Sequence, residues 1–186
     1  MVNWSTFIIH VILMENQVFR KRTYDRSKLT ISALIMHKLS LKNQLQSGRI
    51  PHFFIIVGDS GSGKTSLSRI ISLMLQKEDY KIDPVDTINK YDITEINASD
   101  KNGIDDIRSL SEIIKYKPMP PSRAKIIILD EAHQLTTPAQ NALLKVTEDT
   151  SNFLFFIFCT TNLSKIIEAL KRRANILKMN GLDYKG

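Results

Sequence analysis

The sequence predicts an α/β fold in which a parallel β-sheet is covered by helices on both faces. Three observations support this fold class. Apolar strand-like runs alternate with helical segments along the chain, which is the order that builds a parallel sheet. These runs are continuously apolar, as expected for strands that are buried on both faces. A glycine-rich loop, Gly58–Thr65, joins one of these runs to a helix, and active residues of such sheets gather beyond the C-terminal ends of the strands.

The N-terminal part of the chain holds one predicted helix and a basic segment. Residues 7–14 are apolar but far fewer than the roughly 20 residues that span a membrane, and a short strand or a short helix fits them equally. Residues 15–30 are polar and basic, which is typical of an exposed arm, with nucleic-acid contact as the sharper alternative. Residues 31–47 repeat apolar positions at helical spacing. Gly48 and Pro51 separate this helix from the following strand.

Strands and helices then alternate towards the C-terminus. The first strand covers Phe53–Val57, and the apolar positions of Leu67–Leu75 recur at helical spacing. Residues 77–90 are charged and are typical of a connecting loop. A second strand fits Ile93–Asn97. The remaining predicted elements are a helix over 103–116 that ends at Lys117–Pro121, strands over 126–129, 153–159 and 176–177, and a helix over 138–148.

Length and composition fit one globular domain with an appended segment. The chain has 186 residues, of which 42% are hydrophobic and 24% are charged, in the ordinary range for globular proteins. Its formal net charge of +7 favours an anionic partner such as nucleic acid or nucleotide phosphates, although an ordinary basic surface fits the charge equally well. The single cysteine, Cys159, excludes an internal disulfide and a cysteine-cluster zinc site. A reducing cytoplasmic setting is therefore the default expectation.

Gly58–Thr65 has the residue pattern of a phosphate-binding loop. The glycines allow backbone N–H groups to approach phosphate oxygens closely, and the following helix directs the positive end of its dipole at the same point. In this pattern Lys64 reaches the β- and γ-phosphates, and the Thr65 hydroxyl holds Mg²⁺. The alternative is a glycine-rich turn that only joins a strand to a helix, and the completeness of the pattern disfavours it.

Two acidic residues, Asp130 and Glu131, directly follow the predicted strand 126–129. An aspartate at the end of a buried strand can hold Mg²⁺ through water, and the adjacent glutamate can orient or deprotonate an attacking water. The pair favours hydrolysis of a nucleoside triphosphate over phosphate transfer to a small molecule. Two acids that merely end a strand are the alternative. The sequence assigns no catalytic role to His133.

Polar residues also follow the predicted strand 153–159, which is expected beside the strand that ends at Asp130. Thr160, Thr161 and Asn162 would then lie close to a bound nucleotide. There they can hydrogen-bond the γ-phosphate or the attacking water. An ordinary polar turn is the alternative reading of these three residues.

With these motifs in this order, the chain resembles the ATPase module of sliding-clamp loaders. These loaders include the gamma/tau subunit of bacterial DNA polymerase III and the small subunits of replication factor C. These proteins belong to the AAA+ class. The resemblance covers about residues 39–179, and it implies a P-loop NTPase fold with three α/β/α layers and a five-stranded parallel sheet. The segments that carry it are Gly48–His52, the Walker A segment Gly58–Ser66, Glu95–Asp100, Gly103–Arg108, the Walker B segment Asp130–His133, Gln140–Lys145 with Glu148, and Thr160–Asn162 with Lys165–Ile167.

The resemblance implies ATP and Mg²⁺ as cofactors and ATP hydrolysis as the activity. Lys64 and Thr65 would bind phosphates and Mg²⁺, Asp130 would serve the metal, and Glu131 would activate water. The nucleotide would be contacted by the whole Walker A segment: Gly58, Asp59, Ser60, Gly61, Ser62, Gly63, Lys64, Thr65 and Ser66.

Three further roles follow from the resemblance. Thr161 aligns best with the family's sensor-1 residue, and Asn162 is the near alternative. Arg173 falls where the family has an arginine that reaches the ATP of the next subunit, although the family's Ser-Arg-Cys motif reads Arg172-Arg173-Ala174 here. Without the resemblance, this segment would be interpreted as a basic surface cluster. Arg108 falls where the family often has a basic residue facing DNA phosphates.

The resemblance also implies partners and a domain organisation. The expected partners are other clamp-loader subunits, a sliding clamp and primer–template DNA, with no membrane. We expect an N-terminal extension over residues 1–38 and an AAA+ core over residues 39–186. Because the sequence stops at Gly186, where the family's helical lid begins, neither the lid nor the C-terminal collar domain is expected within it.

Several functions fit these observations. The leading hypothesis is an ATPase subunit of a clamp loader that acts in DNA replication. A second is a nucleotide-binding subunit without a lid that hydrolyses nothing on its own. A P-loop kinase for a small molecule is a third, but it leaves the segments 95–108 and 138–148 unexplained. A DEAH-box helicase would need a second core domain, for which the chain is too short.

Overall fold

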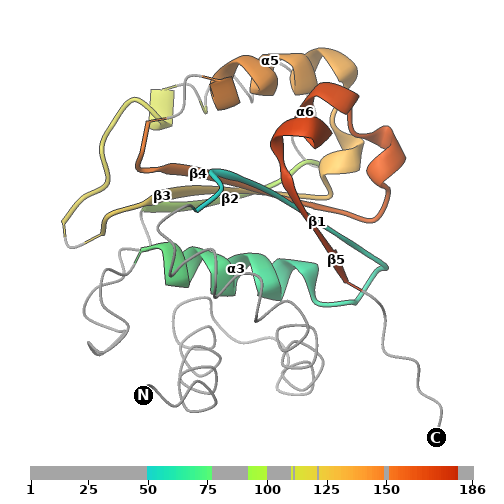
Figure 1. Ribbon diagram of the computed structural model, residues 1–186, viewed down its shortest axis with the longest axis horizontal. Coiled ribbons are helices and arrows are strands. Elements are labelled where there is room, and N and C mark those ends of the chain that lie inside the picture. Colours follow the sequence, from blue (N-terminus) through green and yellow to red (C-terminus); the bar gives the residue numbers. More distant parts are fainter. Residues whose placement is uncertain are drawn as a thin grey trace, which may run out of the picture.

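The computed structural model describes residues 50–76, 92–99, 110, 112–120, 122–148 and 151–179. Its centre is a five-stranded sheet in the order β2-β3-β4-β1-β5 (Figure 1). The strands are β1 (Phe53–Gly58), β2 (Ile93–Asn97), β3 (Lys125–Asp130), β4 (Leu154–Thr160) and β5 (Asn175–Met179). Every pairing is parallel, so the C-terminal ends of all five strands lie along one edge of the sheet.

Helices cover both faces of the sheet, as expected for a parallel sheet. The helix α3 (Lys64–Leu75) lies on one face, and α5 (Thr137–Glu148) and α6 (Glu168–Arg173) lie on the other (Figure 1). Two short 3₁₀ helices, η3 (Ala132–Gln134) and η4 (Leu163–Lys165), connect β3 to α5 and β4 to α6. The predicted three-layer α/β/α architecture is therefore confirmed.

Each face of the sheet has its own hydrophobic core, because successive side chains of a strand point to opposite faces. Towards α3 the strands present residues such as Ile56 and Ile157, which pack with Leu67 of that helix. Towards α5 and α6 they present residues such as Ile55 and Phe156. The central strands β3 and β4 are buried along almost their whole length. This burial explains why their sequences are continuously apolar.

The elements expected from the sequence largely match those of the structure. All five strands are present with their expected order along the chain, and the loop at Gly58–Thr65 leads directly into α3. The expected helix over 138–148 is α5, and the strand expected over 153–159 begins and ends one residue later, as β4. As predicted, β3 and β4 are neighbours. The expected elements over 7–14 and 31–47, the basic segment 15–30, the whole 77–90 loop and most of the 103–116 helix lie outside the described residues.

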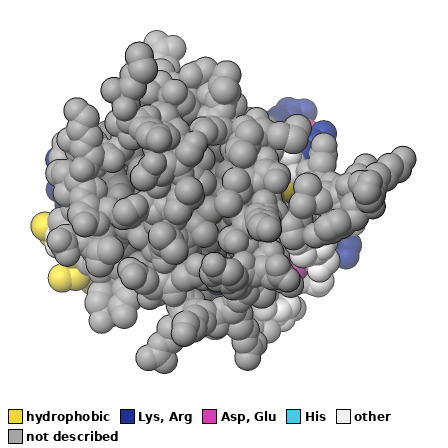
Figure 2. All heavy atoms as spheres, turned by 90° about the horizontal axis from the view of Figure 1, so that it is seen from below, with side chains coloured by type: hydrophobic (Ala, Val, Ile, Leu, Met, Phe, Trp, Pro, Cys, Tyr) yellow, Lys and Arg dark blue, Asp and Glu magenta, His cyan; other side chains and the backbone are white. Residues whose placement is uncertain are grey.

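The surface of the described part of the chain carries few large apolar side chains. The exposed ones are Ile113, Tyr116 and Met119, which belong to the segment preceding β3. In Figure 2 hydrophobic side chains show mainly at one end of the molecule, and Lys and Arg side chains show at both ends. None of the helices in the described ranges is both long and apolar enough to cross a bilayer.

Candidate active site

The loop between β1 and α3 has the backbone geometry of an anion-binding turn. Gly61 and Gly63 have φ values of 77° and 91°, in the left-handed region that glycine enters at little cost. The N–H of Ser62 donates to the carbonyl of Asp59 at 3.1 Å and closes the turn. Gly63 also ends the loop at the N-terminus of α3, where unpaired backbone N–H groups favour a negatively charged ligand.

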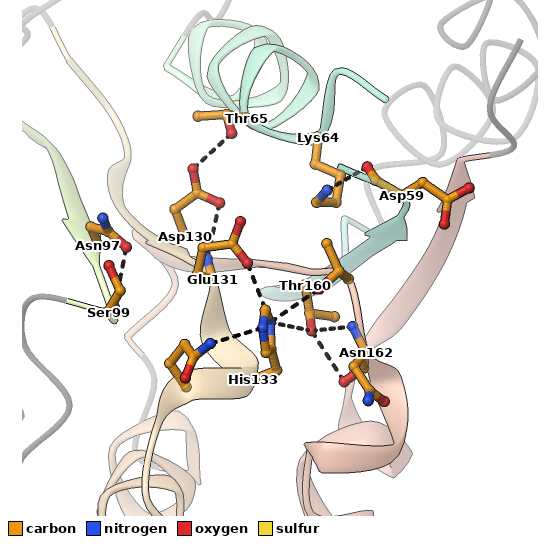
Figure 3. A network of polar contacts seen from close by, with 12 residues as sticks. Asp59, Lys64, Thr65, Asn97, Ser99, Asp130, Glu131, His133, Thr160 and Asn162 are labelled. Carbon is orange, nitrogen blue, oxygen red and sulfur yellow. Dashed lines mark hydrogen bonds and ion pairs between the residues drawn. The ribbon is translucent and has the colours of Figure 1, made fainter. Parts of the chain in front are cut away.

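Lys64 is the buried cation of this loop. Its residue is only 6% exposed, and its Nζ donates to the backbone carbonyl of Asp59 at 2.8 Å. Figure 3 shows the Asp59 carboxylate pointing away from this contact. Within the described ranges Lys64 forms no ion pair with a carboxylate. A buried ammonium group without a counter-ion is costly, and an anion placed in the loop would remove that cost.

Gly58 is required by the close approach of the loop to β5. A Cβ atom added here would lie 2.7 Å from Ser62 Oγ and 2.8 Å from the carbonyl oxygen of Met179. These contacts are far below van der Waals distance, and the carbonyl belongs to a strand of the sheet. The glycine therefore allows β5 and the loop to pack against each other.

We expect the substitution Gly58→Ala to lower the free energy of unfolding by about 3 kcal/mol, because overpacking a rigid site forces the backbone to shift. Gly61→Ala is the matched control, since a Cβ there meets nothing within 4 Å. Its loss in the free energy of unfolding should be only the cost of placing alanine in a left-handed backbone conformation, about 1 kcal/mol. Urea unfolding of both variants provides the comparison. Equal losses, or a larger loss for Gly61→Ala, would contradict the packing argument.

The acidic residues predicted to follow β3 lie directly beside the loop. The Thr65 hydroxyl donates to Asp130 Oδ2 at 2.7 Å, so the first turn of α3 and the end of β3 present two oxygen groups side by side (Figure 3). Mg²⁺ prefers oxygen ligands and is usually held by one or two protein groups together with phosphates and water. The residues present at this position therefore fit a magnesium ion.

Glu131 has an unusual backbone conformation. Its φ of 52° and ψ of 39° place it in the left-handed region, and it is the one non-glycine residue with positive φ in the described ranges. Its N–H donates to Asp130 Oδ1 at 3.0 Å, and its carbonyl accepts from the N–H of Gln134. Such strained backbones occur frequently at active sites. This turn directs the Glu131 side chain towards His133, with Oε2 lying 3.3 Å from Nδ1.

The polar residues after β4 fall into two groups. The hydroxyls of Thr160 and Thr161 lie 3.4 and 3.5 Å from His133 Nδ1, on the same side as Glu131. Asn162 instead caps η4, because its side-chain oxygen accepts hydrogen bonds from the N–H and the hydroxyl of Ser164. Of the two candidates for the sensor position, Thr161 is therefore the one with a side chain free of a capping role.

Arg173 does not join this group of residues within the chain. It ends α6, on the face of the sheet opposite α3 (Figure 1). Its Nη2 forms an ion pair with Glu148 Oε1 at 2.7 Å, and both side chains are partly exposed. Arg108 lies outside the described residues.

Sequence reasoning missed two residues that connect the site. His133 lies at the centre of the polar network in Figure 3, and the signal for it was its position next to the acidic pair. Gln140 of α5 is buried and donates from Nε2 to the carbonyls of Leu135 and Lys165. Its Oε1 accepts from the N–H of Ile167 at 2.8 Å. Gln140 thus ties α5 to the segments that follow β3 and β4.

Cys159 is a core residue, as its apolar surroundings in the sequence suggested. Burial raises the pKa of its thiol, and the negative charge of Asp130 acts in the same direction. A thiol of this kind stays protonated and unreactive at neutral pH. Cys159 therefore contributes packing between α3 and β4, not chemistry.

Comparisons with known proteins agree with the fold and identify the relatives of this chain. Residues 36–183 match the sequence family described as DNA polymerase III, delta subunit. The chain is 37% identical over 163 residues to the DNA polymerase III subunit gamma/tau of Mycoplasma genitalium, covering 82% of this chain and 27% of that protein. It is also 37% identical over 145 residues to the replication factor C small subunit of Picrophilus torridus, covering 77% of this chain and 42% of that protein.

Solved structures show the same fold. A DNA polymerase III gamma subunit-related protein from Thermotoga maritima superimposes with a TM-score of 0.62 at 21% identity, covering 77% of this chain and 46% of that one. Thermotoga maritima RuvB superimposes with a TM-score of 0.56 at 18% identity, covering 84% and 46% of the two chains. The chain thus spans less than half the length of each of these relatives.

Proposed function

The chain belongs to the clamp-loader family of AAA+ proteins, which acts in DNA replication, and we propose that it is an ATP-binding and ATP-hydrolysing subunit of a sliding-clamp loader. The observation that carries this proposal is the ammonium group of Lys64, which is buried inside the glycine loop next to the Thr65–Asp130 pair and has no carboxylate partner among the described residues. Members of this family are ATPases. The positions of Lys64, Thr65 and Asp130 thus support the proposal that this chain also binds and hydrolyses ATP.

In this proposal the loop and Lys64 bind the phosphates of ATP. Backbone N–H groups of Gly58–Ser66 and the N-terminus of α3 would surround the β-phosphate. The Lys64 ammonium group would give up its hydrogen bond to the Asp59 carbonyl and donate to phosphate oxygens instead. Thr65 and Asp130 would hold Mg²⁺, which supplies charge neutralisation between the β- and γ-phosphates. All these groups lie at the C-terminal edge of the sheet.

Hydrolysis would use the residues at the ends of β3 and β4. Glu131 would accept a proton from the attacking water as general base. The Thr161 hydroxyl would hydrogen-bond the γ-phosphate as the sensor, with Asn162 holding the turn that carries it. Such a site switches between assemblies, because a bound γ-phosphate favours one arrangement of the subunits over another.

The position of Arg173 supports a role for its side chain in the nucleotide site of a neighbouring subunit. It lies at the end of α6, on the other face of the sheet from α3, and is held by Glu148 on the surface. A surface ion pair of this kind costs little to break, so Arg173 could exchange Glu148 for the γ-phosphate of a neighbouring subunit. The proposed partners are other clamp-loader subunits, a sliding clamp and primer–template DNA, with Arg108 contacting DNA phosphates, at replication sites in the cytoplasm.

The separation of Arg173 from the chain's own loop also favours a second candidate. The chain would then bind nucleotide alone but hydrolyse it only when a neighbour supplies its arginine. A kinase for small molecules is disfavoured, because it gives no reason for the match over residues 36–183.

The function is tested by measuring assembly and turnover together. We expect the chain to show little ATP turnover alone and a clear increase when companion clamp-loader subunits, clamp and primed DNA are added. Size-exclusion chromatography with light scattering should show that ATP promotes the larger assembly. A chain that stays monomeric and whose turnover is indifferent to these partners would contradict the clamp-loader role and the trans role of Arg173.

A further inference from the structure

We propose that His133 is the positioning residue of the hydrolytic site, because its ring joins the Glu131 carboxylate to the end of β4. The inference rests on the proposed function, since positioning Glu131 matters for turnover only if Glu131 is the general base. The chemistry of hydrolysis is otherwise unchanged: the proton of water moves to the Glu131 carboxylate as the water oxygen attacks the γ-phosphorus, and ADP leaves.

The need for a positioning residue follows from the exposure of Glu131. Its side chain is 38% exposed and extends from a strained left-handed backbone. A glutamate in such a place has several rotamers of similar energy, and general-base catalysis needs one of them. The His133 side chain is only 11% exposed and lies 3.3 Å from Glu131 Oε2. A buried, rigid ring can hold the carboxylate in one orientation.

The hydrogen-bond directions around the ring are consistent with this role. Gln134 Nε2 lies 3.2 Å from His133 Nε2, and an amide nitrogen can only donate. His133 Nε2 is therefore the acceptor, and the proton of the neutral ring is on Nδ1. This is the nitrogen that lies 3.3 Å from Glu131 Oε2, so the ring presents an N–H group to the carboxylate.

The same Nδ1–H also reaches the end of β4. Thr160 Oγ1 lies 3.4 Å from Nδ1, and the Thr160 hydroxyl donates its own hydrogen to the carbonyl of Asn162 at 3.2 Å. Thr160 must consequently accept from the ring. The Nδ1–H group thus lies between the Glu131 carboxylate and the end of β4.

In this arrangement the hydroxyl hydrogen of Thr161 is not used within the network. Its hydroxyl lies 3.5 Å from Nδ1, and because Nδ1 carries the ring proton, the Thr161 hydrogen is available for an acceptor outside the network. In the proposed function that acceptor is the γ-phosphate. His133 would therefore set the distance between the base and the phosphate-sensing end of β4.

Three variants of His133 separate positioning from mere packing. In His133→Asn, the amide nitrogen takes the place of Nδ1, so the donor to Glu131 is retained. In His133→Gln, the amide nitrogen takes the place of Nε2, so that donor is lost at similar volume. His133→Ala removes both. Steady-state ATP turnover is measured for the full chain assembled with companion clamp-loader subunits, clamp and primed DNA, and nucleotide affinity is measured by calorimetry.

We expect kcat of His133→Ala and His133→Gln to fall by about 10- to 100-fold, the scale of a catalytic group displaced by a fraction of an ångström. His133→Asn should keep kcat within about threefold of the unmodified chain, because it keeps an N–H group next to the Glu131 carboxylate. The Kd for ATP should change less than about twofold in all three, since the ring's contacts are with Glu131, Gln134 and the end of β4 and not with the Gly58–Ser66 loop that would bind most of the phosphate oxygens. Unchanged kcat in His133→Gln, or equal loss in His133→Asn and His133→Gln, would overturn the inference.

The substitution Glu131→Gln separates this inference from the function on which it rests. If His133 acts through Glu131, adding His133→Gln to Glu131→Gln should cause no further loss of turnover. A further loss of the same size as in the single variant would overturn the positioning role. Turnover that survives Glu131→Gln would overturn the assignment of the base itself. Turnover that is lost in Glu131→Gln and normal in His133→Gln would overturn only the role of His133.

Discussion

Replacing Lys64 with alanine is expected to weaken the binding of Mg-ATP by at least about 100-fold, which corresponds to about 2.7 kcal/mol. Hydrogen bonds to charged groups contribute about 1.5–3 kcal/mol each, and Lys64 would make more than one with the phosphates. The structure supports the upper part of this range, because the ammonium group is buried and has no carboxylate partner in the described ranges. Turnover should disappear together with binding.

The measurement is calorimetric titration of ATP in the presence of Mg²⁺. Lys117→Ala is the matched control, since Lys117 is an exposed lysine in the segment that precedes β3 and its removal changes the net charge equally. Its nucleotide affinity should stay within about twofold of the unmodified chain, as expected for a screened surface charge. Equal affinities in Lys64→Ala and the unmodified chain would show that the loop is not the phosphate site.

The substitution Glu131→Gln should separate binding from hydrolysis. Glutamine keeps the size of the side chain but cannot accept the proton of the attacking water, so turnover should fall by about 10²- to 10⁴-fold, the usual contribution of a general base. Binding of ATP should stay nearly unchanged, because the carboxylate faces His133 and not the loop. Loss of a negative charge near the phosphates would, if anything, tighten binding slightly.

Turnover of the assembled complex and the Kd of ATP both need to be measured for this variant. Glu112→Gln is the control, because Glu112 is an exposed glutamate that pairs with Lys115 on the surface. Both quantities should be unchanged in the control. Turnover by Glu131→Gln at the rate of the unmodified chain would contradict the assignment of Glu131 as the base.

The parts of the fold that were predictable from sequence are those set by local pattern and strong burial. The strands β3 and β4 are continuously apolar because both faces are covered, and this made them recognisable. The loop was recognisable because Gly61 and Gly63 occupy backbone conformations that other residues rarely adopt. Since Asp130 and Thr160 end neighbouring parallel strands, their proximity could also be expected before the structure was known.

The contacts that could not be predicted join residues far apart in sequence through side-chain geometry. His133 and Thr160 are separated by 27 positions, and their contact depends on the left-handed turn at Glu131, for which glutamate has no preference. Asn162 was a candidate sensor, but its oxygen caps η4, and a polar triplet in sequence does not reveal which member is used locally. The pairing of Arg173 with Glu148 likewise depends on how α5 and α6 pack.

We propose above all that a magnesium-bound triphosphate occupies the space between the loop that ends at Lys64 and the carboxylates of Asp130 and Glu131. Calorimetric titration of the folded chain with Mg-ATP and with Mg-ADP tests it most directly. We expect a saturable heat of binding with one nucleotide per chain, which Lys64→Ala abolishes. Cooperative unfolding serves as the control that the protein is folded. Absence of any binding heat with either nucleotide in such protein, even after companion subunits are added, would contradict this proposal.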